Sequence, residues 1–168
     1  MLRLASAKCD SKPGIRFVEG DLNTLPFAPA TFDVVLIGYG LRYLDDLGES
    51  MRAAHRVLRP GGVLLSLDFG LPPRRWYRAF CLSYLFVFGT LWGLLLHRKA
   101  DTYWHIVESL QAYPGQDALG RAMLEAGFTR VAIAEQLGGI SVLARAERGG
   151  EPDGAGNGRR IGSIVVSE

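Results

Sequence analysis

Two segments rich in apolar residues, 33–38 and 63–69, most constrain what this chain can fold into. Such segments are typical of strands buried on both faces of a parallel sheet. Between them, residues 46–58 carry apolar side chains at helical spacing behind a capping box that begins at Asp46. The sequence Arg-Pro-Gly-Gly at residues 59–62 ends that helix, because proline lacks an N–H and glycine adopts the left-handed turn. The pattern predicts a right-handed βαβ unit with parallel strands.

Shorter patterns extend this unit. Residues 15–18 alternate between apolar and polar side chains, which predicts a short strand. Residues 129–134 and 140–146 are apolar segments joined through two glycines, as in an antiparallel hairpin. Two more helices are expected, one after Asp101 and one after Asp117. The predicted fold class is therefore α/β.

Composition excludes several classes of protein. The 168 residues are 48% hydrophobic and 21% charged, which suits one globular domain and excludes a wholly disordered chain. A net charge of +2 argues against nucleic acid as a partner. Cys9 and Cys81 lack the spacing of a disulfide framework or a zinc site, so no metal is expected. Reduced cysteines and the lack of a secretory signal in residues 1–14 predict a cytoplasmic location.

Residues 79–96 contain no charged side chain and just reach the length of a membrane-spanning helix. A span at this place would put the βαβ unit and the closing hairpin on opposite sides of the membrane, which one sheet does not allow. We therefore do not favour a span. Aromatic and basic side chains at the ends of this segment predict peripheral contact with the inner face of the membrane through residues 76–99.

Several weak motifs occur in one order along residues 1–146, and in that order they resemble the class I S-adenosylmethionine methyltransferases. They are Phe17-Val18-Glu19-Gly20-Asp21, Leu25-Pro26-Phe27, Phe32-Asp33-Val34-Val35, Arg56-Val57-Leu58-Arg59-Pro60-Gly61-Gly62 and Glu125-Ala126-Gly127-Phe128. A second set resembles the UbiE-type ubiquinone/menaquinone biosynthesis C-methyltransferases more narrowly. It comprises Gly40-Leu41-Arg42, Leu137-Gly138-Gly139-Ile140 and the segment 101–114.

The resemblance implies an incomplete Rossmann-like methyltransferase sheet in a partial domain of residues 1–146. It also implies a helical apolar lid or insert at about residues 71–113 and a C-terminal antiparallel hairpin. The glycine-rich composition of residues 151–158 separately predicts that residues 147–168 form a flexible tail. The family's first strand, its glycine-rich loop and the acidic residue that binds the ribose of S-adenosylmethionine have no counterpart in this sequence. We therefore expect a fragment or a late start site, weak binding of S-adenosylmethionine, and an exposed sheet edge at the strand 33–38.

The activity that the resemblance implies is C-methylation of a lipophilic polyprenyl quinol, with S-adenosylmethionine as the methyl donor. Benzoquinol and naphthoquinol both remain open as acceptors, and the sequence indicates no oligomeric state. Two other functions also remain open. One is a non-catalytic membrane-associated protein that uses the methyltransferase remnant as an interaction surface. The other is a methyltransferase for another small lipophilic acceptor.

The resemblance places S-adenosylmethionine at the ends of two strands. Asp21, or the N–H of its neighbour Leu22, corresponds to the adenine-binding position, and an Asp that caps a loop is an equal alternative. Gly38 ends the next strand at the ligand crevice, where ligands of parallel sheets bind. The alternative for Gly38 is close packing against a helix.

Arg42 is the predicted catalytic residue, because in the family this arginine lies near the quinol, where a cation could hold a phenolate oxygen or a water. The alternative is an ion pair with Asp45 or Asp46. Family members often have asparagine at the position of Tyr43. The predicted substrate-binding residues are Tyr39, Tyr43 and Asp68, with a turn or capping role as the alternative for Asp68. His55 is expected to face solvent, and His97 and His105 to be structural or solvated.

Overall fold

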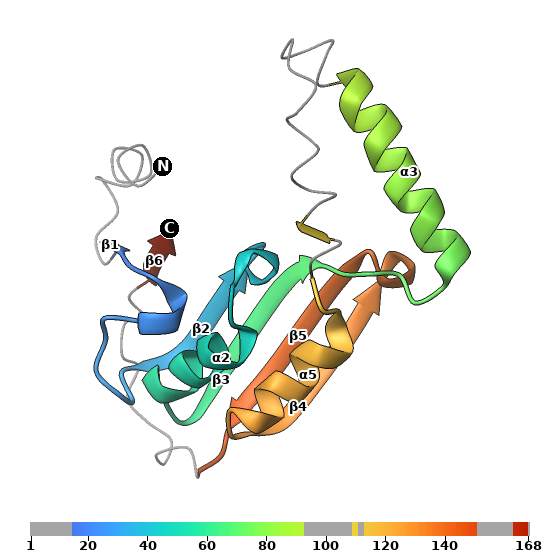
Figure 1. Ribbon diagram of the computed structural model, residues 1–168. Helices are drawn as coiled ribbons and strands as arrows, with labels where there is room; N and C mark the ends of the chain where they lie inside the picture. Colours follow the sequence, from blue (N-terminus) through green and yellow to red (C-terminus); the bar gives the residue numbers. More distant parts are fainter. Residues whose placement is uncertain (1–14, 93–108, 111–112, 151–162, 168) are drawn as a thin grey trace.

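The computed structural model describes residues 15–92, 109–110, 113–150 and 163–167, and its centre is a four-stranded sheet with the strand order β2-β3-β5-β4 (Figure 1). β2 and β3 are parallel, and the other two pairs are antiparallel. A separate parallel pair joins β1 to β6. The strands are β1 (Ile15–Glu19), β2 (Phe32–Gly38), β3 (Leu58–Phe69), β4 (Phe128–Gln136), β5 (Ser141–Arg148) and β6 (Ser163–Ser167).

The predicted βαβ unit is confirmed by β2, α2 (Leu47–Val57) and β3. The Asp46 side chain accepts a hydrogen bond from the Glu49 N–H at 2.8 Å, as the capping pattern predicts. One boundary differs from the prediction, because β3 starts at Leu58, directly after the helix. Residues 59–62 therefore lie within the strand, and Gly61 supplies a positive φ of 77° near its start.

The predicted antiparallel hairpin is also confirmed. β4 and β5 are joined by the 3-10 turn η5 (Leu137–Gly139). Before the hairpin lies α5 (Gln116–Glu125), which begins earlier than predicted, so that Asp117 is in its first turn and Gly115 is the capping residue. Gly127, with φ of 102°, follows the helix as the expected left-handed residue.

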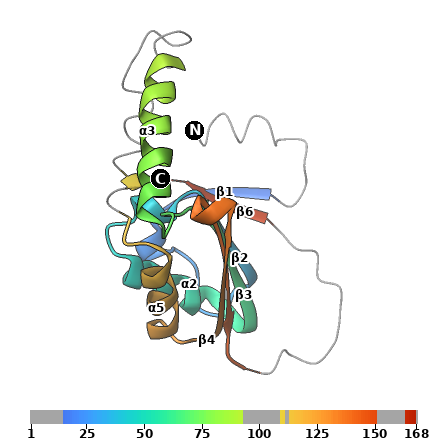
Figure 2. The same ribbon diagram turned by 90° about the vertical axis from the view of Figure 1, so that its right-hand side faces the viewer.

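The core lies between one face of the sheet and the helices α2 and α5, which Figure 2 shows on the same side of the sheet. Met51 and Ala54 of α2, Leu119 and Met123 of α5, and Leu64 of β3 are at most 1% exposed. Burial of these apolar side chains stabilises the packing of both helices on the sheet.

The opposite face of the sheet exposes large apolar side chains. Leu36 of β2 is 73% exposed and pairs with Leu65 of β3, and Leu67 pairs with the half-exposed Leu143 of β5. Within the described residues β2 pairs with β3 alone, so the predicted edge position of this strand is observed. An apolar edge strand of this kind is prone to pair with another chain.

The helix α3 (Arg75–Trp92) extends away from the sheet (Figure 1). It contains most of the predicted apolar stretch 79–96, the last four residues of which lie outside the described residues. None of the helices in the described ranges is both long and apolar enough to cross a bilayer. The helix predicted after Asp101 also falls outside the described residues, except for Ser109 and Leu110, as do His97 and His105.

The C-terminal region differs from the predicted flexible tail 147–168. β5 continues to Arg148, and β6 pairs in parallel with β1, with Val165 opposite Phe17. The run Ile-Val-Val at residues 164–166 is rich in β-branched side chains, which favour strands. The prediction of a tail was based on the glycine-rich segment 151–158 before it.

Candidate functional site

A buried ion pair lies where β2 and β3 end. Arg42 belongs to the 3-10 turn η2 (Leu41–Tyr43), and its Nη1 lies 3.1 Å from Oδ1 of Asp68 near the end of β3. The two side chains are 8% and 2% exposed. Asp45 and Asp46, the alternative partners in the sequence, do not pair with Arg42, since Asp46 caps α2. The parallel pairing of β2 and β3 brings the ion pair together.

Both oxygens of the Asp68 carboxylate accept hydrogen bonds from the protein. Its Oδ2 accepts from the Leu41 N–H at 2.8 Å, and its Oδ1 accepts from the Phe69 N–H at 2.7 Å as well as from Arg42. A buried carboxylate requires such compensation for its lost hydration. The contacts also tie the turn η2 to the end of β3.

Aromatic rings surround the guanidinium of Arg42. Its central carbon lies 4.7 Å from the ring centroid of Tyr43 and 5.1 Å from that of Phe69. Arg42 Nη2 also donates to the Tyr43 hydroxyl at 3.2 Å, and the ring of Tyr39 lies 5.2 Å from that of Phe69. Arg42 is thus held by cation–π contacts on a surface where Tyr39 and Tyr43 remain about half exposed. The structure brings together the predicted catalytic residue and all three predicted substrate-binding residues.

Two features of this site store free energy. Tyr39 has a positive φ of 56°, which is strained for a residue with a side chain, and its N–H donates to the Leu67 carbonyl at 2.8 Å. The Nε of Arg42 is buried and has no hydrogen-bond partner within the described part of the chain. A buried unpaired donor costs about 1–3 kcal/mol, a cost that a ligand oxygen would remove.

Tyr113 is a member of the site that the sequence analysis did not select. Its side chain is 3% exposed, and burial, together with the nearby charge of Asp68, raises the pKa of Tyr113 to about 12. It lies at the end of the insert and belongs to the same core cluster as Ile37 and Leu41. Its place in the 101–114 motif was the available signal, but proximity to Asp68 depends on tertiary packing.

The predicted S-adenosylmethionine-binding residues lie at the ends of β1 and β2. Asp21 is exposed, and its carboxylate accepts from the Asn23 N–H at 2.8 Å and caps the short turn η1 (Leu22–Thr24), as the loop-capping alternative predicts. Leu22 packs partly buried against the core. A Cβ added at Gly38 would meet no atom within 4 Å, so helix packing is not what requires glycine there.

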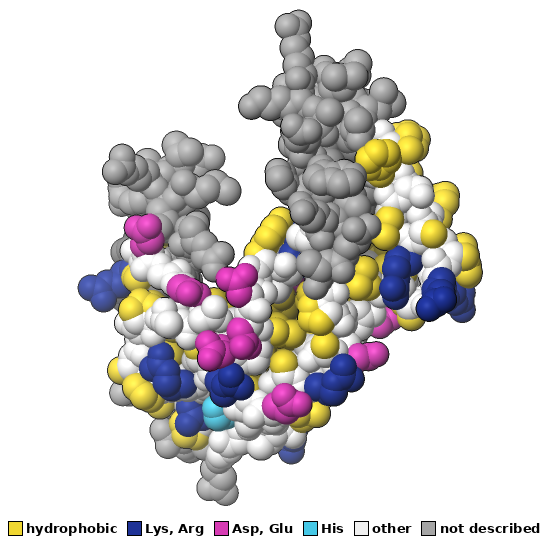
Figure 3. Space-filling view, in the orientation of Figure 1, with side chains coloured by type: hydrophobic (Ala, Val, Ile, Leu, Met, Phe, Trp, Pro, Cys, Tyr) yellow, Lys and Arg dark blue, Asp and Glu magenta, His cyan; other side chains and the backbone are white. Residues whose placement is uncertain are grey.

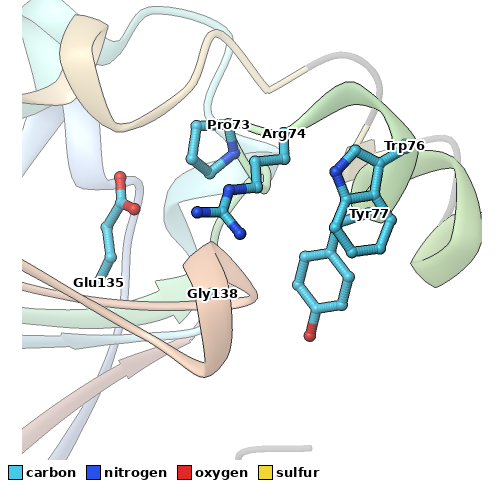
Figure 4. Close-up of a pocket in the computed structure, with 6 residues that line it drawn as sticks. All are labelled: Pro73, Arg74, Trp76, Tyr77, Glu135 and Gly138. Carbon is cyan, nitrogen blue, oxygen red and sulfur yellow. The ribbon is translucent and has the colours of Figure 1, made fainter.

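A hollow, separate from the Arg42 site, lies at the base of α3. It has a volume of about 440 Å³ and is lined by Pro73, Arg74, Trp76, Tyr77, Glu135 and Gly138 (Figure 4). A Cβ at Gly138 would lie 2.7 Å from Cε1 of Tyr77, whose hydroxyl donates to the Leu137 carbonyl at 3.3 Å. The glycine turn of the hairpin therefore allows α3 to pack closely against η5.

The two ends of the insert meet beside this hollow. The amide Nε2 of Gln116 donates to the Leu71 carbonyl at 3.1 Å, and its Oε1 accepts from the Leu71 N–H at 3.4 Å. Nε2 also donates to Oε1 of Glu135 at 2.6 Å. The buried amide of Gln116 thus joins the start of the insert, its end and β4.

The remaining titratable candidates have structural roles. His55 does not face solvent as predicted, because its ring packs edge-on against Phe128 at 5.0 Å. Burial lowers the pKa of His55, and the charge of Arg148 lowers it further, while a main-chain hydrogen bond at Gly127 opposes both. Within residues 15–92, 109–110, 113–150 and 163–167 no three His, Cys, Asp or Glu side chains gather as a metal site.

Comparison with known proteins gives a consistent match. Residues 1–148 match the model of the ubiE/COQ5 methyltransferase family. The ubiquinone/menaquinone biosynthesis C-methyltransferase UbiE of Ectopseudomonas mendocina is 39% identical over 131 residues, which cover 78% of this chain and 51% of that protein. The UbiE protein of Azotobacter vinelandii is 39% identical over 131 residues, which cover 78% of this chain and 52% of that protein. The chain thus spans about half the length of these curated relatives.

Solved structures share the fold. The CMeT domain of the citrinin polyketide synthase has a TM-score of 0.61 at 16% identity, covering 90% of this chain and 37% of that one. A SAM-dependent methyltransferase from Aquifex aeolicus has a TM-score of 0.57 at 15% identity, covering 87% of this chain and 62% of its own. At these identities the likeness shows the architecture of a methyltransferase domain and nothing finer.

Proposed function

The chain belongs to the ubiE/COQ5 methyltransferase family, and from that premise we propose that it serves in S-adenosylmethionine-dependent C-methylation of a lipophilic quinol. The observation that supports this most directly is the Arg42 site. A buried, fixed guanidinium with an unpaired Nε–H lies among the rings of Tyr39, Tyr43 and Phe69, at the carboxyl ends of β2 and β3. This surface suits a flat, electron-rich ring that carries hydroxyl groups.

The rate of the proposed reaction depends mainly on how the quinol ring is positioned relative to the methyl group. S-adenosylmethionine supplies an electrophilic methyl group on its sulfonium. A quinol ring carbon forms the new bond to this methyl group, and the bond from the methyl group to sulfur breaks with its electrons remaining on sulfur. The proton on that ring carbon then leaves to water, which restores the aromatic ring, and the ring oxygen that lost its proton to water takes one back, so that one proton is released overall. Arg42 stabilises negative charge on a ring oxygen as the hydroxyl proton departs, and Tyr39 and Tyr43 orient the ring.

The described residues fit one side of S-adenosylmethionine. Gly38 adjoins open space at the end of β2, and the exposed Asp21 lies with Leu22 at the end of β1, where the resemblance places the adenine. The glycine-rich loop that the family uses for the methionine end has no counterpart in the 168-residue sequence. Our proposal is therefore that this polypeptide alone binds S-adenosylmethionine weakly and transfers methyl groups slowly.

Contact with a membrane surface belongs to the same proposal. α3 exposes Trp76, Phe80 and Tyr84, and basic side chains gather near its start, where Arg74 and Arg75 are exposed (Figure 3). A helix with aromatic side chains and a basic end suits the interface of an anionic bilayer, from which a polyprenyl quinol would enter. Sedimentation with anionic and with neutral vesicles tests this, and W76S/F80S should reduce binding to the anionic vesicles.

A chimeric enzyme tests the catalytic proposal. Residues 15–148 would replace the aligned segment of the Ectopseudomonas mendocina UbiE protein, and the chimera would be incubated with S-adenosylmethionine and short-tailed benzoquinols or naphthoquinols. We expect a ring-methylated product by mass spectrometry, at least about tenfold less of it with R42A. A folded chimera that methylates no quinol, beside an active parent enzyme, contradicts the proposal.

Isothermal titration calorimetry tests the proposed weak binding of S-adenosylmethionine separately from the proposed reaction. The 168-residue chain and the chimera would each be titrated with S-adenosylmethionine. We expect the chimera to bind at least about tenfold more tightly, because it contains both sides of the site. Equally tight one-to-one binding by the chain alone contradicts the impairment but leaves the proposed reaction intact.

A further inference from the structure

Asp68 is buried in its ion pair with Arg42. Both of its carboxylate oxygens are occupied, Oδ1 by Arg42 Nη1 and the Phe69 N–H, and Oδ2 by the Leu41 N–H. The side chain is 2% exposed. Because the carboxylate is buried and both of its oxygens accept hydrogen bonds from the protein, its contacts with Arg42 and the turn η2 suffice to explain an acid at this position.

The same contacts restrict Arg42. Nη1 is bound to Asp68, Nη2 donates to the Tyr43 hydroxyl, and the Leu41 N–H fixes the turn that carries the arginine. Nε is the nitrogen of this guanidinium that has no partner within the described residues. The half-exposed ring of Tyr43 lies over the guanidinium at 4.7 Å, so a surface side chain covers this face of Arg42.

We propose that Asp68 is a positioning residue, which holds the Arg42 guanidinium in one orientation so that its Nε–H remains for an oxygen of the acceptor ring. The inference rests on the proposed function for the identity of the acceptor. Asp68 itself does not contact the acceptor. A fixed charge that needs no reorientation during the reaction is more effective than a mobile one, and misplacement by about 1 Å can cost about a hundredfold in rate.

Tyr113 reinforces this arrangement. It is buried at the end of the insert, and the Asp68 charge acts on its hydroxyl. Tyr113 also shares the core cluster with Leu41 of the turn that carries Arg42, which links the end of the insert to this turn.

The first experiment observes the orientation itself and requires no activity. In the ¹⁵N-labelled 168-residue chain, the Arg42 Nε–H should give a resolved signal that exchanges slowly with water. D68N should abolish this protection while the main-chain spectrum remains folded, and D68E should restore part of it. The matched control is D33N, because Asp33 pairs with Arg59 at the surface and is 67% exposed. Unchanged Nε–H protection in folded D68N overturns the inference.

The second experiment measures the consequence in the chimera. We expect D68N to lower kcat by about tenfold to a hundredfold with little change in KM for the quinol, and D68N/R42A to be no slower than R42A. D33N should leave both constants unchanged. If D68N lowers kcat no more than D33N does, the positioning role is wrong. If the chimera itself is inactive while the Nε–H signal depends on Asp68, the proposed function fails and the positioning of Arg42 stands.

Discussion

Arg148 donates a hydrogen bond through Nη1 to the main-chain oxygen of His55 at 2.9 Å, across 93 residues of sequence. The same nitrogen donates to the main-chain oxygens of Arg56 and Leu58. These carbonyls lie at the C-terminal end of α2, where unpaired oxygens and the helix dipole favour a positive charge. The last residue of β5 therefore terminates a helix from the other half of the domain.

Replacement of Arg148 should destabilise the fold. We expect R148M to lower the free energy of unfolding by about 2 kcal/mol, because buried carbonyl oxygens lose a charged donor. Urea unfolding followed by circular dichroism measures the change. The matched control is R145M, since the Arg145 side chain is half exposed in its pair with Glu147 and should contribute less than about 1 kcal/mol. Equal losses in the two variants would contradict the role of Arg148.

Stability should fall as the pH drops below the ordinary pKa of histidine. Burial, and then the charge of Arg148, lower the pKa of His55 in the folded state from 6.5. The unfolded chain therefore binds a proton at a higher pH than the folded chain does, and acid favours unfolding. Urea unfolding between about pH 7.5 and pH 5.5 should show this slope, and H55Q should reduce it. A slope as steep in H55Q as in the parent would assign the effect to other groups.

Alkaline pH should act through Tyr113. The pKa of Tyr113 in the folded state, about 12, lies above the ordinary tyrosine pKa of 10.0, so its stabilising contribution is complete below pH 10 and is lost as the pH rises toward 12. Y113F should remove this part of the alkaline loss. Ultraviolet titration of tyrosinate should show one group moving to lower pH in D68N, because the Asp68 charge raises the pKa. An unchanged titration in D68N would leave burial as the whole cause.

The exposed edge of β2 should promote self-association. Leu36 is 73% exposed on the uncovered face, so L36K should decrease aggregation with little change in the free energy of unfolding. Light scattering against protein concentration measures aggregation, and urea unfolding measures the free energy of unfolding. The control is I37K on the same strand, where the side chain is 8% exposed and a charge should disrupt the core. Unchanged association in L36K would place the contact elsewhere.

Gly138 should be needed for the docking of α3. G138A adds a Cβ at 2.7 Å from Tyr77 and at a φ of +66°, so both strain and displacement of Tyr77 are expected. G115A is the matched control, because Gly115 has a φ of +91° with nothing within 4 Å and isolates the strain. G138A should lower the free energy of unfolding further than G115A and shift the fluorescence of the neighbouring Trp76. Identical effects would mean that the Tyr77 contact contributes nothing.

Local patterns predicted the elements that depend on neighbours in sequence. The capped helix α2, the parallel pairing around it and the glycine-linked hairpin all follow from periodicity and turn chemistry. The resemblance led to Arg42, but the true partner of this arginine, Asp68, is 26 residues away. That pairing depends on how β2 and β3 end together, and sequence spacing favoured the nearer acids.

The wrong prediction for His55 and the omission of Tyr113 also involve contacts between residues that are far apart in sequence. The solvent-facing prediction for His55 failed because Phe128 and Arg148 come from the far end of the chain. Tyr113 was not selected because its contact with the site requires the insert to return to the sheet. In both cases the sequence indicated the local secondary structure around the residue. It did not indicate which distant residue would contact that residue in the folded chain.

The side-chain amide of Gln116 holds the main chain at Leu71 on both its donor and its acceptor. The points at which the insert leaves and rejoins the domain are therefore adjacent. The closure at Leu71 and Gln116 uses main-chain atoms and one amide, and none of these hydrogen bonds comes from the residues between them. A change in the length or polarity of the insert would therefore leave this junction and the strand order β2-β3-β5-β4 as they are.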